Sequence, residues 1–285
     1  MQNTILNPAG KILVLTSSST GNNVFCTPAI RFLRKHLPTT VIDVVALNAL
    51  SAEVFQDNPD IDNLHIVSKP RAFDKLAANY STVIGLNVNA TRKLAGIKAN
   101  LLLAPAFVEG EARAEQLLQY VAGLLQQPVS DEDRHYVIGN GMQTGASVLD
   151  QQSIADDSLL VGIHLGLGRT LLHGWKFFYK DRANDVRLWP IEKYIALAQQ
   201  LVSANPKIRI VVTGTRNESF LARQLVRAVP NTINLAGKTS ASDVYRLMRR
   251  LNLFIAHDCG VFHIASASDV PIVGLYGPTD PLLAG

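Results

Sequence analysis

Residues 253–267 read LFIAHDCGVFHIASA, and this stretch decides the fold. Its first four residues, 253–256, form an apolar run with the length of a short buried strand. Residues 261–267 follow as a helical stretch, and Gly260 between the two provides a tight turn where the backbone can approach a ligand closely. The stretch therefore predicts a strand, a turn and a helix, which is the repeating unit of a parallel sheet.

The same alternation continues along most of the chain. Short apolar or β-branched runs predict strands at residues 12–16, 41–45, 64–67, 82–86 and 101–103, and again at 159–164, 208–213, 232–235, 253–256 and 272–276. Helices are predicted at residues 28–37, 113–126, 191–204, 218–228, 242–250 and 261–267. The first of these helices is expected to begin near Pro28 and to stop before Pro38.

A polar stretch, residues 128–157, interrupts the alternation, and we interpret it as an interdomain region. The predicted fold class is therefore α/β, with two Rossmann-like, doubly wound domains at residues 1–155 and 156–285 that face a cleft. Ligands of such sheets bind beside the carboxyl ends of the strands, so these ends are the places to look for functional residues.

Composition narrows the class of protein. The chain has 285 residues, of which 47% are apolar and 18% charged, as in globular proteins. Its net charge of +4 is spread thinly, so nucleic-acid binding is not expected. Cys26 and Cys259 lack the spacing of a metal or redox motif, which predicts no metal site and a reducing compartment. The first apolar run is too short for a leader or membrane span, so we expect a cytoplasmic protein with peripheral membrane contact at most.

The strongest candidate site follows the strand at residues 253–256. Asp258 lies at the strand end, where it can cap the next helix or accept hydrogen bonds from sugar hydroxyls. Backbone N–H groups around Cys259 and Gly260 are the unsatisfied donors of a first helical turn and suit a diphosphate. His263 lies in the first turns of that helix and is either a ligand contact or a neutral histidine satisfied by the backbone.

Three more segments place polar residues near strand ends. Glu218 follows the strand at 208–213, where it can meet a ribose hydroxyl or serve ordinary helix N-terminal chemistry. Arg187, just before a helix, can neutralise phosphate charge through its fork of donors. Thr279, in a rigid Gly-Pro turn after the last strand, offers a hydroxyl. Each segment alone is a weak signal, and their shared placement at strand ends is the evidence for a ligand site.

The ordered series of motifs resembles a known family. It consists of Gly-Ile-His-x-Gly (162–166), Arg-x-Trp-Pro (187–190), Thr-Gly-x-x-x-Glu (213–218), Asn-Leu-x-Gly-Lys-Thr-Ser (234–240), Asp-x-Gly-x-x-His-x-Ala-x-Ala (258–267) and Tyr-Gly-Pro-Thr-Asp-Pro (276–281). This order is similar to that of glycosyltransferase family 9, the bacterial heptosyltransferases that build the inner core of lipopolysaccharide. The first strand, the loop at 17–21 and the first helix resemble the family more loosely.

The resemblance implies a fold, a reaction and roles for residues. The fold would be GT-B, without metal or cofactor, with the acceptor bound by the N-terminal domain and the nucleotide-sugar, ADP-heptose first, by the C-terminal one. The reaction would transfer heptose or a related sugar with inversion onto a lipopolysaccharide core or similar glycolipid at the inner membrane. Matching positions give the donor site Asp258, Cys259, Gly260, His263, Arg187, Glu218 and Thr279, and the acceptor loop Ser18 and Gly21.

Two departures bear on catalysis. Many family members carry Gly-Asp in the first loop, with the aspartate as proposed general base, whereas this chain has Gly21-Asn22. An amide cannot accept the proton, and loss of a general base typically costs ~10²–10⁴-fold in rate. The chain also stops at Gly285, where members continue with a helical stretch, so a truncated or divergent form is expected.

Alternatives to transfer differ in how well the residues support them. A catalytically weak nucleotide-sugar-binding protein remains open because of Asn22. An epimerase of the same fold would need carboxylates from both domains, and the first loop offers none. Dinucleotide oxidoreduction and serine hydrolysis lack their motifs, Gly-x-Gly-x-x-Gly after the first strand and Gly-x-Ser-x-Gly.

Overall fold

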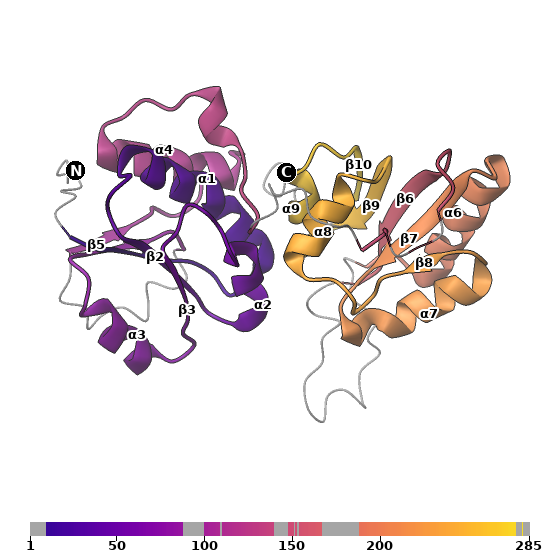
Figure 1. Cartoon of the computed structure of the whole chain (residues 1–285), viewed down its shortest axis with the longest axis horizontal. Coiled ribbons are helices and arrows are strands. Elements are labelled where there is room, and N and C mark those ends of the chain that lie inside the picture. The colour runs from indigo at the N-terminus through magenta and orange to yellow at the C-terminus, as the bar shows by residue number, and fades with distance from the viewer. Residues whose placement is uncertain are drawn as a thin grey trace. The chain divides into compact units, whose positions relative to one another are not determined.

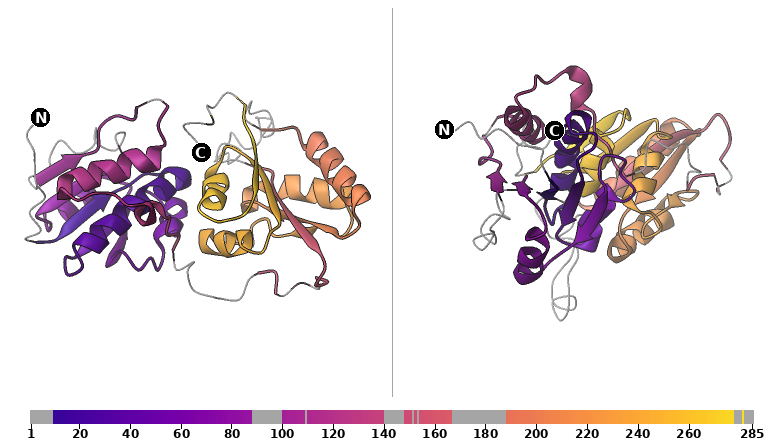
Figure 2. Two further views of the ribbon diagram at one scale, coloured as in Figure 1. Left: turned by 90° about the horizontal axis from the view of Figure 1, so that it is seen from above. Right: turned by 60° about the vertical axis from the view of Figure 1, so that its left-hand side comes forward.

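The computed structural model describes residues 10–87, 100–108, 110–139, 148–150, 152, 154–166, 188–277 and 281. The chain divides into two compact units, Met1–Met142 and Gln143–Gly285. Within the described residues, each unit contains a five-stranded sheet whose paired strands are all parallel (Figure 1). Figure 2 shows the helices packed over these sheets from two other directions.

The N-terminal unit has the strand order β3-β2-β1-β4-β5. Its elements are β1 (Ile12–Leu15), α1 (Thr20–His36), β2 (Ile42–Ala46), α2 (Ala49–Ala52), η1 (Glu53–Phe55), β3 (Asn63–Ile66), α3 (Pro70–Ala77), β4 (Thr82–Gly85), β5 (Asn100–Leu103), α4 (Arg113–Leu125) and η3 (Asp131–Arg134). Helices α1 and α4 pack together over one face of the sheet, and α3 covers the other (Figure 1). The strand order reverses between β1 and β4.

The C-terminal unit has the order β10-β9-β6-β7-β8. Its elements are β6 (Leu159–His164), α6 (Ile191–Ala204), β7 (Ile208–Thr213), η5 (Arg216–Glu218), α7 (Ser219–Ala228), β8 (Ile233–Asn234), α8 (Ala241–Met248), β9 (Leu253–His257), α9 (Gly260–Ser266) and β10 (Ile272–Leu275). Because parallel connections are right-handed, α8 and α9 lie on the opposite face from α6 and α7. The strand order reverses between β6 and β9.

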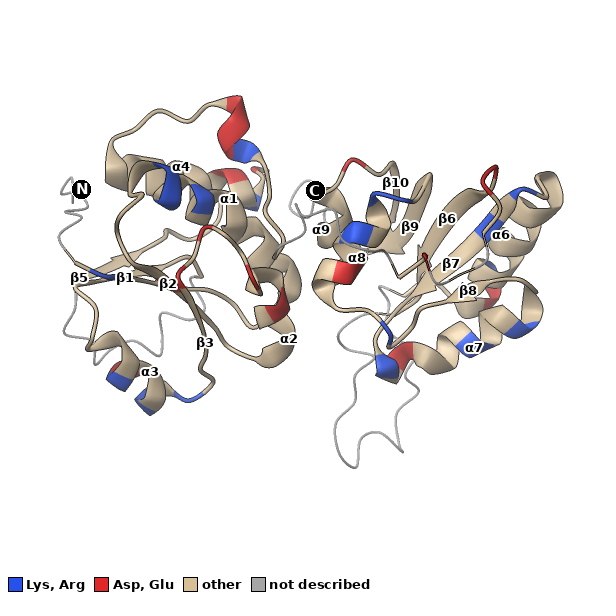
Figure 3. Cartoon of the chain, in the orientation of Figure 1, with Lys and Arg blue, Asp and Glu red and all other residues tan. Residues whose placement is uncertain are grey.

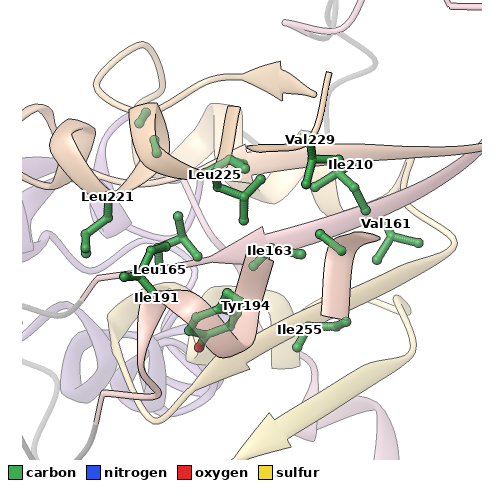
Figure 4. Close-up of a cluster of buried hydrophobic side chains, with 14 residues drawn as sticks. Val161, Ile163, Leu165, Ile191, Tyr194, Ile210, Leu221, Leu225, Val229 and Ile255 are labelled. Atoms are coloured by element: carbon green, nitrogen blue, oxygen red, sulfur yellow. The ribbon is translucent and has the colours of Figure 1, made fainter. Parts of the chain in front are cut away.

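Burial explains why these strands form. All the residues of β1, β2 and β4 are buried, as expected for a parallel sheet covered on both faces. In the C-terminal unit, Val161 and Ile163 of β6 pack with Tyr194 of α6 and with Leu221 and Leu225 of α7 (Figure 4). Charged residues are found mainly in helices and turns (Figure 3). None of the helices in the described parts of the chain is long and apolar enough to cross a membrane.

The start of α1 was predicted wrongly. The helix begins at Thr20, eight residues before Pro28, and Pro28 lies inside it. A proline inside a helix removes one backbone donor and leaves the carbonyl four residues earlier without its partner. Here the Thr27 hydroxyl replaces that donor, because its Oγ1 donates to the Val24 carbonyl oxygen over 2.9 Å. The helix therefore continues through the proline, and Gly21 and Asn22 belong to its first turn.

Replacement of Thr27 by valine should destabilise the N-terminal unit. The hydroxyl also accepts a hydrogen bond from the Val137 amide over 3.3 Å, so Thr27→Val leaves two buried backbone groups without partners. We expect a loss of about 2–4 kcal/mol in the free energy of unfolding, measured by urea denaturation. The exposed Thr39→Val is the control. Equal urea midpoints for Thr27→Val and the wild type would contradict this account of α1.

Candidate functional site

The carboxyl ends of strands β6 and β9 define the candidate site in the C-terminal unit. The two strands pair side by side, and they are the pair at which the strand order reverses. Loops leaving such a pair diverge to opposite faces and open a crevice in which α/β proteins bind ligands. His164 ends β6 and His257 ends β9, and their ring centroids lie 6.1 Å apart.

The loop after β6 touches the loop after β7 through Gly166 and Glu218. A Cβ atom on Gly166 would lie 2.3 Å from Glu218 Oε1, so a larger residue there would force the Glu218 side chain to move. The Thr215 amide donates to Glu218 Oε2 over 2.6 Å, and the two residues form a capping box. Glu218 is only 3% exposed. The predicted helix N-terminal role of Glu218 is therefore present, and its contact with a ribose stays a prediction.

The loop after β8 joins the same edge through Gly237. Gly237 has a φ of +74° and donates its amide to the Gly214 carbonyl over 2.7 Å. A Cβ atom at this position would lie 2.9 Å from the Cα atom of Arg216, so glycine is required for both conformation and space. The motifs at 213–218 and 234–240 are thus held against each other.

Asp258 and His263 form a pair in the loop after β9. His263 Nε2 lies 3.3 Å from Asp258 Oδ1, and the two side chains are 9% and 17% exposed. The carboxylate is therefore oriented from the helix that follows it. The ring of Phe262 packs edge-on against Tyr276, with centroids 5.7 Å apart, which brings the segment after β10 to the same edge.

Cys259 and Gly260 complete the turn into α9. Cys259 is the N-cap residue and Gly260 is the first residue of the helix. Burial raises the pKa of the Cys259 thiol to about 12, so it stays protonated at neutral pH and acts as a small packed side chain. Two predicted donor residues, Arg187 and Thr279, lie outside the described residues.

Sequence reasoning gave no role to the buried histidines at this edge. His164 Nδ1 lies 2.9 Å from Thr213 Oγ1, and His257 Nδ1 lies 3.3 Å from the hydroxyl oxygen of Tyr194. Burial lowers the pKa of His164 to about 4, and burial together with the neighbouring His164 lowers the pKa of His257 to about 4. Both are neutral at pH 7. Their position as the last residues of two paired apolar strands was the signal available in the sequence.

The predicted acceptor residues lie at the corresponding edge of the N-terminal unit. Ser18 is exposed and its carbonyl accepts a hydrogen bond from Asn48 Nδ2 over 2.8 Å, whereas Gly21 is buried in α1. Asn22 Oδ1 accepts a hydrogen bond from Arg113 Nη1 over 3.1 Å. Sequence reasoning missed Arg113, because nothing in the sequence shows that α4 packs against α1.

A small pocket adjoins Asn22. It lies between the loop after β1 and the end of β4, where the strand order of this unit reverses. Its volume of about 10 Å³ gives room for about one water molecule. The lining residues are Ser17, Asn22, Phe25, Cys26, Leu86, Asn87, Phe107 and Leu117. Polar groups from both strand ends therefore face one small space.

Comparison with known proteins shows what the C-terminal part of the chain resembles. The sequence profile of glycosyltransferase family 9 (heptosyltransferase) matches residues 177–285, which contain the loops after β7, β8, β9 and β10. The C-terminal part of the chain is similar to glycosyltransferase family 9. Lipooligosaccharide heptosyltransferase 2 of Haemophilus influenzae is 30% identical over 98 residues, 33% of this chain and 28% of that protein. Lipopolysaccharide heptosyltransferase 3 of Escherichia coli is 21% identical over 286 residues, 91% of this chain and 81% of that protein.

Solved structures show the fold of this chain. A family 9 glycosyltransferase from Veillonella parvula superposes with a TM-score of 0.75 at 20% identity, over 100% of this chain and 85% of that one. The ADP-heptose heptosyltransferase II of E. coli gives a TM-score of 0.70 at 19% identity, over 96% and 86%. The predicted class, GT-B with two Rossmann-like α/β domains, is confirmed.

The buried histidines should make this protein acid-sensitive. In the unfolded chain each histidine binds a proton near pH 6.5, whereas in the folded chain it does so only near pH 4. The free energy of unfolding should therefore fall as the pH drops from about 6.5 to about 4, by at most about 3 kcal/mol per histidine.

Urea unfolding at a series of pH values measures this effect. Tryptophan fluorescence reports on the C-terminal unit, which contains His164 and His257, because both tryptophans, Trp175 and Trp189, lie within residues 143–285. His257→Asn should flatten the pH dependence between 6.5 and 4, and the exposed His135→Gln should leave it unchanged. An unaltered slope in His257→Asn would show that the buried histidine does not cause the effect.

Proposed function

We propose that the chain is an inverting glycosyltransferase that moves a heptose or a related sugar from a nucleotide-diphosphate donor, ADP-heptose first, to a glycan acceptor of the lipopolysaccharide-core kind. The observation that supports this most is the meeting of the family's motifs at the β6/β9 edge. Gly166, Glu218, Gly237 and Asp258 come from four loops spread along the sequence. Contacts hold the first three loops together, and the pairing of β6 with β9 places the loop of Asp258 beside that of Gly166.

The donor roles follow from the chemistry of this edge. Asp258 is a carboxylate held by His263 and still partly exposed, which suits hydrogen bonds from the hydroxyl groups of a sugar. The amides at the start of α9 suit the diphosphate, and Arg187 and Thr279 are assigned to the same group from their motif positions. Glu218 keeps the loop after β7 in place and is also assigned to the ribose.

Transfer requires a nucleophilic acceptor oxygen and a leaving group that can carry charge. The acceptor hydroxyl attacks the anomeric carbon on the face opposite the diphosphate, which inverts the configuration there, and the nucleoside diphosphate departs with the bonding electrons. Donors aimed at the diphosphate stabilise the charge that develops on it. We propose that the transfer reaction needs no metal ion and that the N-terminal unit holds the acceptor. We propose further that the reaction takes place at the cytoplasmic face of a membrane.

A second candidate function is nucleotide-sugar binding with little transfer. Asn22 favours it, because an amide cannot take the proton of the acceptor hydroxyl and its oxygen already accepts a hydrogen bond from Arg113. A transfer assay with labelled ADP-heptose separates the two functions. Binding without any labelled glycan product would favour the second.

Calorimetry tests the donor site directly. We expect ADP to bind more tightly than UDP or GDP, and ADP-heptose more tightly than ADP. Asp258→Ala should weaken the binding of ADP-heptose by ~10–100-fold. This corresponds to about 1.5–3 kcal/mol of binding free energy, as expected for hydrogen bonds to a charged group. The same variant should change ADP affinity little, because the carboxylate is assigned to the sugar.

The exposed Asp269→Ala in the same unit is the matched control and should bind both ligands as the wild type does. If Asp258→Ala weakened the binding of ADP and of ADP-heptose equally, Asp258 would support the structure of the loop and would not contact the sugar. Absence of binding to any nucleotide by the folded wild type would refute the donor site.

A further inference from the structure

Tyr194 contacts two segments of the proposed donor site. The residue belongs to α6, and its side chain is fully buried. Its hydroxyl oxygen lies 3.3 Å from Nδ1 of His257, the last residue of β9. Its ring packs edge-on against that of Trp189, with centroids 5.0 Å apart and planes at 85°. One side chain therefore contacts both the segment that leads into α6 and the strand that leads to Asp258.

The position of His257 depends on its side chain. On one side, β9 pairs with β10 as far as His257, which lies opposite Leu275. On the other side, the register with β6 ends earlier, at Ile255 opposite Ile163. Ile255 packs into the core cluster that contains α6 (Figure 4), and His257 two residues later points to the same face of the sheet. The contact with α6 thus fixes the end of β9 where its pairing with β6 has stopped.

The hydrogen bond between Tyr194 and His257 belongs to a longer buried row. His164 Nδ1 lies 2.9 Å from Thr213 Oγ1, and the rings of His164 and His257 are neighbours, with centroids 6.1 Å apart. The row thus crosses from β7 through β6 and β9 to α6, and each of its four side chains is at most 3% exposed. Buried polar groups are costly without partners, so the bonds of the row hold the three strand ends in one arrangement.

We propose that Tyr194 and His257 are positioning residues of the donor site, and that the hydrogen bond between them sets the place of the Asp258 carboxylate. This rests on the proposed function, because it takes Asp258 to be the residue that binds the sugar. Both side chains are fully buried and do not reach a ligand. Their effect passes through Asp258, so it concerns the sugar of the donor and spares ADP.

Calorimetric titration with ADP and ADP-heptose tests this split. Tyr194→Phe removes the hydroxyl group and keeps the ring that packs against Trp189. We expect it to weaken the binding of ADP-heptose by ~3–10-fold, the size of one hydrogen bond between uncharged groups, and to change the binding of ADP by less than about twofold. Tyr245→Phe, in α8 of the same unit, is the matched control and should bind both ligands as the wild type does.

Variants of His257 test whether the two residues act as a pair. His257→Leu removes both ring nitrogens and should weaken the binding of ADP-heptose as Tyr194→Phe does. His257→Asn places an amide group near the position of Nδ1, so the Tyr194 hydroxyl regains a partner and most of the affinity for ADP-heptose should return. Adding Tyr194→Phe to His257→Leu should have no further effect, because the hydrogen bond is already absent.

Hydrogen exchange of the ligand-free protein separates positioning from a general loss of stability. In Tyr194→Phe, the peptide that covers residues 256–262 should exchange faster than in the wild type, whereas the peptide that covers β7 should exchange at the wild-type rate. Local opening at the end of β9 leaves the rest of the sheet closed. A merely structural role would accelerate exchange in both peptides.

Two results would overturn the proposal: wild-type affinity for ADP-heptose in Tyr194→Phe, or equal weakening of ADP and ADP-heptose by that variant. The proposed function fails in a different way, through a folded wild type that binds neither ligand. In that case hydrogen exchange still decides the positioning role, because unchanged exchange at residues 256–262 in Tyr194→Phe would refute it without any ligand.

Discussion

The direction of the strands is the constraint on which the rest of the structure depends. All paired strands in each sheet are parallel, so their carboxyl ends meet at one edge, and loops far apart in the sequence become neighbours there. In the C-terminal unit this edge collects Gly166, Glu218, Gly237 and Asp258 from four different loops. Two glycines without side chains, Gly166 and Gly237, let these loops approach to within van der Waals contact. A side chain at either position would separate loops that the proposed donor site needs together.

The two sheet edges differ in how their charges are satisfied. At the C-terminal edge the carboxylates have protein partners: Glu218 accepts from the Thr215 amide, and Asp258 lies against His263. These contacts fix the carboxylates before any ligand arrives, which lowers the entropy cost of binding. At the N-terminal edge Arg113 faces an amide rather than a carboxylate. The carboxylates of the first edge are therefore held in place by protein groups, whereas the guanidinium of Arg113 is held by an amide and an aromatic ring.

Much of the fold could be predicted from the sequence. The predicted limits of β6, β7 and α6 coincide with the observed ones, because long apolar or amphipathic runs give a strong periodic signal. The start of α1 could not be predicted from Pro28, since the Thr27 hydroxyl replaces the missing donor locally. The contacts of His257 with Tyr194 and of Arg113 with Asn22 join residues 63 and 91 positions apart, and only the packing of helices brings them together. The sequence motifs thus predicted which edge of the sheet carries the site. The hydrogen bonds and charges at that edge could be described only from the structure.

The central claim is that a nucleotide-sugar binds at the edge formed by β6 and β9. Hydrogen exchange measured by mass spectrometry, with and without ADP-heptose, tests it most directly because each backbone amide of the edge reports separately. The account predicts slower exchange in the peptides that cover residues 257–263, 164–166 and 213–218, with little change in α3. Slower exchange confined to other parts of the chain, with these peptides unchanged, would contradict it.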